Sequence, residues 1–306
     1  LISREKIADT VSFFPKDSWE YFSMCVGSMK IATLNTAVLT RRLCEQNKAF
    51  ETDVVWESSP RTRVWFTDAA YGGDRCVGGW AEFGKVLGGQ MVLLAHPPVI
   101  IPVLTTVNEE PETQIAMFMK TECESLGIQP ENVGHDATGR GSLGTFIARV
   151  WSAATHPVES GGAPTERPMS ADLYVNDPKT GQRRLKTCKE GYSKRITEYY
   201  FSVRYAVQAS QVRGITLDTV DEFRLRKWKR VSGDRAELET KEDTKERIGR
   251  SPDLSDWFAG IVEMARRKGF MIAKLANDDA SAPDPGWLRD LARKQQNLLR
   301  SKELVH

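Results

Sequence analysis

The stretch Arg63-Val-Trp-Phe-Thr-Asp68-Ala-Ala-Tyr-Gly-Gly-Asp74 joins an apolar run to an aspartate and then to a glycine turn. Residues 63–66 form a short run of bulky side chains, which is typical of a buried strand. Asp68 stands where that strand would end, and the glycines at 72 and 73 favour a turn immediately after it. We therefore predict a strand that presents an acidic side chain at its carboxyl end.

The same arrangement occurs once more along the chain. Asn132-Val-Gly-His-Asp136 is followed by the turn Thr138-Gly-Arg-Gly-Ser142. Segments 76–83 and 90–101, with 63–66, are joined by short glycine-containing loops, which favours an antiparallel meander. A predicted helix at 112–126 then leads to the strand at 132–136, a helix at 142–153 and a strand at 155–158. This order predicts an α/β fold with a mixed sheet, in which Asp68 and Asp136 share one edge.

A third aspartate, Asp256, opens an amphipathic helix in Ser251-Pro-Asp-Leu-Ser-Asp256. Carboxylates that converge from separate elements suit Mg²⁺ or Mn²⁺, because these hard cations prefer oxygen ligands. Two such ions about 3.5–4 Å apart stabilise both oxygens of an in-line phosphoryl displacement. Asp68, Asp136 and Asp256 are therefore the candidate catalytic and metal-ligating residues of a nuclease.

The remaining segments predict a β-hairpin and several helices. The hairpin pairs 173–175 with 185–188, and a strand is expected at 236–239. Helices are expected at 4–10, 17–24, 36–50, 195–211, 219–228, 241–248, 254–268 and 287–299. The aromatic residues of the 195–211 helix are more typical of a core than of a base-stacking platform. Residues 280–286 have the composition of a linker.

The net charge of the 306-residue chain is only +2, but it is unevenly distributed. Residues 181–250 contain 18 Lys and Arg against 11 Asp and Glu, a local charge of +7. Such a surface favours a polyanion, although the densest run, 224–230, could equally be a solvated helix face. The candidate DNA contacts are Arg183, Arg184, Lys194, Arg195, Lys227, Lys229 and Lys241.

Other classes of protein are disfavoured by the composition. The five cysteines show no metal-ligand spacing, which indicates reduced thiols in a cytosolic compartment. No apolar run reaches the ~18 residues of a membrane span, and no signal peptide is visible. No G-x-x-x-x-G-K-[ST] phosphate loop is found, so we expect no ATP site in this chain.

Four segments, in this order, resemble motifs of phage large terminase subunits. They are Asp68-Ala-Ala-Tyr-Gly-Gly-Asp74, Val133-Gly-His-Asp136, Gly191-Tyr-Ser-Lys194-Arg195 and the run from Glu239 through Ser251-Pro-Asp253-Leu-Ser-Asp256. The resemblance covers about residues 60–268. Two positions depart from the family pattern, because Ser193 replaces an asparagine and the bulky Trp257 replaces a small residue.

The resemblance implies an RNase H-like nuclease domain that cuts concatemeric viral DNA during genome packaging. Asp68, Asp136 and Asp256 would form its metal-binding triad, with Asp74 and Asp253 as auxiliary acids. From the residues alone, Asp253 could instead be a helix cap, and Asp74 a turn residue. His135, next to Asp136, is expected to be a packing residue, because alternation along a strand sends it to the opposite face.

The resemblance also implies a domain plan and partners. Residues 1–60 would be a helical linker toward an ATPase motor on other residues or another chain. Residues 61–269 would form the nuclease domain, with the hairpin insertion around 171–190, and residues 270–306 a tail with a basic helix. The implied partners are double-stranded DNA, the portal protein and the small terminase subunit, in the host cytoplasm on the procapsid. Two alternatives remain: a junction-resolvase or transposase-type nuclease, and a docking module without catalysis.

Overall fold

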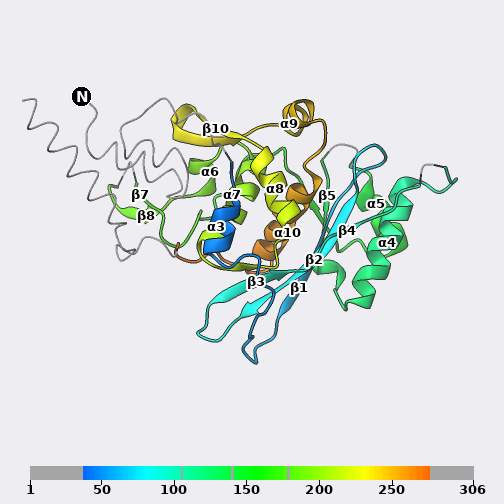
Figure 1. Cartoon of the computed structure of the whole chain (residues 1–306), viewed down its shortest axis with the longest axis horizontal. Helices are drawn as coiled ribbons and strands as arrows, with labels where there is room; N and C mark the ends of the chain where they lie inside the picture. Colours follow the sequence, from blue (N-terminus) through cyan, green and yellow to red (C-terminus); the bar gives the residue numbers. More distant parts are fainter. Residues whose placement is uncertain (1–36, 105, 139–140, 178–179, 276–306) are drawn as a thin grey trace, which may run out of the picture.

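A mixed sheet forms the centre of the computed structural model, which describes residues 37–104, 106–138, 141–177 and 180–275 (Figure 1). Seven strands of the described residues run in the order β6-β5-β1-β2-β3-β9, with β4 paired to β2. Their bounds are β1 Thr62–Asp68, β2 Val77–Lys85, β3 Met91–Ala95, β4 Val99–Ile100, β5 Val133–Asp136, β6 His156–Val158 and β9 Val212–Arg213.

The strand directions confirm the predicted fold class. β1, β2 and β3 form an antiparallel meander, in which Trp65 pairs with Trp80. β5 then pairs with β1 in parallel, and β6 pairs with β5 in parallel. Parallel neighbours require a crossover, which helix α4, Pro111–Ser125, supplies between β4 and β5. The result is an α/β fold with three antiparallel strands followed by parallel ones, as expected of an RNase H-like sheet.

Helices cover both faces of this sheet (Figure 1). Helix α10, Asp253–Arg267, packs against β1, β2 and β5, and α7, Arg195–Gln208, and α8, Leu217–Leu225, pack behind it. On the other face, α4 and α5, Leu143–Val150, enclose a second apolar cluster around Trp65. Alternation along β1 explains the two clusters, because Phe66 points to one face and Trp65 to the other.

Glycines allow α10 to lie close to the sheet. A Cβ at Gly260 would stand 2.1 Å from Phe66 Cε1, and one at Gly79 would stand 2.7 Å from Trp257 Cζ2. The bulky Trp257, which departs from the family pattern, is therefore accommodated by a glycine on β2, and its side chain is buried. Close packing of α10 fixes the position of its first turn relative to the ends of β1 and β5.

The outer segments form smaller units. The predicted hairpin is present as β7, Tyr174–Asn176, and β8, Arg183–Leu185. A second hairpin pairs β10, Trp228–Val231, with β11, Arg235–Leu238. The remaining helices are α3 Arg41–Gln46, α6 Cys188–Gly191 and α9 Lys241–Ile248, with 3₁₀ turns at Pro130–Asn132 and Ser232–Asp234.

Some predicted elements differ from the observed ones. The prediction of a helix over 219–228 is wrong at its carboxyl end. The observed helix α8 stops at Leu225, and Trp228 pairs with Leu238 in a strand. The expected strand at 90–101 is two strands, β3 and β4, divided at His96-Pro-Pro. β9 was not predicted, since two residues carry no periodicity. The expected helices at 4–10, 17–24 and 287–299 lie outside the described residues.

The part of segment 1–60 that the structure describes contributes to the core. Helix α3 is shorter than the predicted 36–50 helix, and it starts at the cap Thr40, whose side chain accepts from Leu43 N at 3.2 Å. Val38, Leu39 and Leu43 belong to the same buried cluster as α7 and α10. The predicted domain boundary at residue 60 stays a prediction. None of the helices in the described segments has the length and apolarity to cross a membrane.

Candidate active site

The three predicted aspartates meet at one edge of the sheet. Asp68 ends β1 and Asp136 ends β5, and these strands are parallel neighbours, so their carboxyl ends lie side by side. Asp256 lies in the first turn of α10, which crosses β1. All three line one cleft of about 590 Å³. The carboxylates that the sequence analysis singled out are therefore brought together by the fold.

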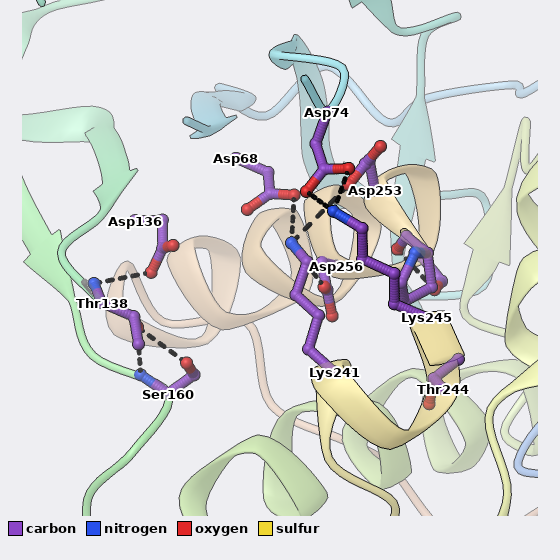
Figure 2. Close-up of polar contacts among 12 residues, drawn as sticks. Asp68, Asp74, Asp136, Thr138, Ser160, Lys241, Thr244, Lys245, Asp253 and Asp256 are labelled. Atoms are coloured by element: carbon purple, nitrogen blue, oxygen red, sulfur yellow. Dashed lines mark hydrogen bonds and ion pairs between the residues drawn. The ribbon is translucent and has the colours of Figure 1, made fainter. Parts of the chain in front are cut away.

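A lysine ammonium lies among these acids (Figure 2). Lys241, the first residue of α9, places Nζ 3.3 Å from Asp68 Oδ2, 3.1 Å from Asp256 Oδ2 and 3.6 Å from Asp253 Oδ1. Asp136 faces the same space from one side, and its Oδ1 accepts from Thr138 N at 2.9 Å. Four carboxylates thus surround a volume in which the ammonium supplies positive charge.

Burial and the neighbouring charges change the pKa values of the carboxylates. Burial raises the pKa of Asp68 well above its usual range; Lys241 opposes this rise, and Asp256, Asp136 and Asp253 add to it. Burial also raises the pKa of Asp136, against the hydrogen bond from Thr138. For Asp256 burial acts in the same direction, but Lys241 and Arg226 outweigh it and lower the pKa. Unlike Asp68 and Asp136, Asp256 is therefore held in its charged form.

The donor chemistry of the cleft fits a hard divalent cation, although the side chains do not stand in a ready ligand geometry. Within the described ranges, no group of three or more His, Cys, Asp or Glu side chains is arranged to hold a metal ion. Asp68 and Asp256 instead contact Lys241 Nζ. Asp253 Oδ1 is buried and accepts no hydrogen bond. A cation could bind Asp68, Asp136, Asp253 and Asp256 once the ammonium moves aside.

The two auxiliary acids differ in their surroundings. Asp253 is the first residue of α10 and is buried, and its Oδ2 accepts from Arg75 N at 3.3 Å and from Arg75 Nε at 3.4 Å. Asp74 lines the cleft, but both of its oxygens accept from Lys245 Nζ at 2.7 Å. Asp253 thus belongs to the acid cluster, while Asp74 is engaged in its own ion pair beside it.

The residues predicted to contact DNA are spread over several elements. Lys194 and Lys241 line the cleft. Arg195 donates to Ala163 O at 2.8 Å, and Arg183 stacks over Tyr174 on the hairpin. Arg184 is held by Asp177 and Glu190. Lys227 and Lys229 are exposed next to and within β10.

Two residues near Asp256 were not singled out from the sequence. Arg226 belongs to the basic run 224–230, yet its side chain is buried and donates from Nη1 to Asp256 Oδ1 at 2.7 Å. Tyr200, predicted as a core aromatic, donates from its hydroxyl to the same oxygen at 2.7 Å. A buried arginine inside a basic run has no signature of its own in a single sequence. His135 is buried as predicted, and burial lowers its pKa to about 4.

The nuclease domain of the large terminase subunit of bacterial virus Sf6 aligns with a TM-score of 0.50 and 12% sequence identity, over 74% of this chain and 98% of that domain. This chain has the fold of that nuclease domain.

Two further solved structures align with the chain. A mutant Sf6 terminase nuclease domain with manganese and β-thujaplicinol aligns at the same TM-score of 0.50, with 12% identity and coverage of 74% and 98%. The large terminase of bacteriophage HK97 aligns with a TM-score of 0.44 and 9% identity, over 85% of this chain and 50% of that one. No protein-family model matches the sequence, and the search of curated proteins gives no match.

Proposed function

We propose that this chain is the nuclease domain of a phage terminase large subunit, a metal-dependent endonuclease that cuts concatemeric double-stranded DNA. The observation that carries the proposal is the meeting of Asp68, Asp136 and Asp256 in one cleft of a terminase-nuclease fold. Nothing in an ordinary stable core requires four carboxylates to face one another, because burying like charges is costly.

The proposed cofactors are two Mg²⁺ or Mn²⁺ ions, which is in keeping with the manganese bound by the Sf6 domain. Asp68, Asp136 and Asp256 would hold these ions, with Asp253 beside them. When bound, such ions activate a water molecule and stabilise the leaving oxygen of a phosphodiester. This assignment uses acids that already face the cleft.

The remaining roles fall to cationic side chains of the cleft. Lys241 would leave the carboxylates and neutralise the phosphate charge that develops during cleavage, as electrostatic stabilisation requires a fixed positive group near that charge. Lys194 lines the same cleft and would hold a neighbouring phosphate. DNA would therefore be bound through its backbone, without reading of base edges.

The biological setting is part of the proposal. The chain would act beside an ATPase motor on other residues or another chain, with the portal protein and the small terminase subunit as partners. It would work in the host cytoplasm, docked on the procapsid. These partners follow from the resemblance of the four motifs and from the shared fold.

Nicking of supercoiled plasmid in Mn²⁺ tests the proposal. We expect Asp68→Asn to lower the cleavage rate by at least about 100-fold, because the acid central to metal binding is lost. Asp218→Asn is the matched control, since Asp218 is exposed on α8 and does not line the cleft. Undiminished cutting by Asp68→Asn would remove this residue from the mechanism.

A further inference from the structure

Two buried side chains, Tyr200 and Arg226, donate hydrogen bonds to Asp256 on the side away from Lys241. Its Oδ1 accepts from Tyr200 Oη at 2.7 Å and from Arg226 Nη1 at 2.7 Å. Arg226 Nη1 also donates to Tyr200 Oη at 3.1 Å, and Arg226 Nε donates to Glu239 O at 3.0 Å. Tyr200 is fully buried and Arg226 is 3% exposed, so this network is sheltered from solvent.

The two oxygens of Asp256 therefore have different surroundings. Oδ1 is engaged by two donors on the protein side, while Oδ2 faces Lys241 Nζ at 3.1 Å in the cleft. Charge-assisted hydrogen bonds of this length are strong and directional. They fix the carboxylate so that only Oδ2 is available to a ligand in the cleft.

The backbone beneath Asp256 is fixed by the same part of the chain. Glu222 Oε2 accepts from Leu254 N at 2.7 Å and from Ser255 N at 3.2 Å, which satisfies donors in the first turn of α10. Glu222 lies four residues before Arg226. Residues 222–226 thus fix both the start of α10 and the orientation of its carboxylate.

We infer that Tyr200 and Arg226 are positioning residues that make Asp256 a one-oxygen ligand and so favour Mg²⁺ or Mn²⁺ over Ca²⁺. The inference rests on the proposed function. Mg²⁺-type sites demand near-octahedral geometry, whereas Ca²⁺ takes six to eight oxygens and accepts carboxylates through both. Freeing Oδ1 would let Asp256 bind with two oxygens, which suits the larger ion.

Calorimetric titration of the full chain with Mn²⁺ and, separately, with Ca²⁺ tests this inference. Tyr200→Phe keeps the ring and removes only the hydroxyl, which donates to Asp256, accepts from Arg226 and contacts Ser255 Oγ. We expect its Mn²⁺ affinity to fall about tenfold, as is typical when a residue that orients a ligand is lost. The Ca²⁺ affinity should fall much less, so the ratio of the two affinities changes. A residue with a merely structural role would not change that ratio.

Arginine variants extend the test. Arg226→Met should change the ratio in the same direction. Arg226→Lys should not restore it, because lysine lacks the planar guanidinium in which Nη1 contacts Tyr200 and Asp256 while Nε contacts Glu239 O. Arg224→Met is the matched control, since Arg224 is exposed and pairs with Asp221. If Arg226→Met fails to fold, Tyr200→Phe decides the result.

The outcomes separate this inference from the proposed function. A wild-type chain that binds no Mn²⁺ overturns both. If Asp256→Asn abolishes Mn²⁺ binding while Tyr200→Phe leaves the Mn²⁺-to-Ca²⁺ ratio unchanged, the positioning role alone is wrong. A changed ratio in Tyr200→Phe, with Arg224→Met unchanged, supports it.

Discussion

Lys241 balances the charge of the acid cluster, since its ammonium contacts three carboxylates. We expect Lys241→Met to lower the free energy of unfolding by about 1–3 kcal/mol in metal-free protein at pH 7, because buried carboxylates lose their partner. Added Mn²⁺ should restore much of the loss. Urea denaturation with EDTA or with Mn²⁺ measures both effects.

Lys245→Met is the control for this variant. Lys245 pairs with Asp74, and both side chains are more exposed than the acid cluster, so we expect a loss below about 1 kcal/mol. Equal losses of unfolding free energy in the two variants would contradict the role of Lys241 in balancing the acid cluster. An absence of any effect of Mn²⁺ on Lys241→Met would contradict it too.

Arg184 gives a pH-dependent prediction away from the cleft. Its hydrogen bond lowers the pKa of Glu190 to about 2. A carboxyl with a depressed pKa stabilises the fold above its unfolded pKa, and this contribution is lost as the pH falls through the folded pKa. The stability difference between wild type and Glu190→Gln should therefore be present at pH 7 and disappear between about pH 4.5 and about pH 2.

NMR titration of the Glu190 carboxyl checks the cause. Arg184→Met should move the Glu190 pKa back toward its ordinary value. Arg183→Met, which alters the neighbouring arginine stacked on Tyr174, should leave that pKa where it was. An unchanged Glu190 pKa in both variants would contradict Arg184 as the cause of the lowered pKa.

At the scale of elements, the contact between α10 and the sheet depends on glycine. We expect Gly260→Ala to destabilise the protein by about 1–3 kcal/mol, because its methyl group would overlap Phe66. Gly161→Ala is the control, since nothing lies within 4 Å of its added methyl. Thermal unfolding of both variants measures the difference, and equal midpoints would refute the close approach.

The elements that place the candidate catalytic acids could be predicted from sequence. The short apolar runs before Asp68 and Asp136, and the amphipathic helix after Asp253, have clear periodicity. The two-residue β9 could not be predicted, because its partner is distant in the chain: Val212 pairs with Leu93. The end of α8 was missed for a different reason, since Trp228 starts a local hairpin in which it pairs with Leu238.

The site was predictable only in part for a related reason. Acids that end strands are visible in a sequence, whereas the burial of Arg226 and the contact of Tyr200 with Asp256 depend on how α7, α8 and α10 pack. The placement of Lys241 inside the cluster also depends on tertiary structure. Its charge alone suggested a phosphate contact, and the structure adds three carboxylate partners.

At the scale of the whole molecule, the proposed affinity for DNA should fall as the salt concentration rises. We expect Lys194→Met to weaken duplex binding in EDTA and to reduce the slope of log K against log salt by about 0.9, the value for one phosphate contact. Lys189→Met removes the same charge from an exposed lysine that pairs with Glu166 outside the cleft. Fluorescence anisotropy at several salt concentrations would show whether the two variants differ.

The order in which the chain is synthesised has a consequence for the proposed site. β1, with Asp68, is made early, but α10 carries Asp256 and also covers β1, β2 and β5. A nascent chain that has not yet released residue 267 from the ribosome therefore lacks both a candidate metal-binding carboxylate and the helix that packs on the sheet. The proposed site would form only after synthesis has passed α10.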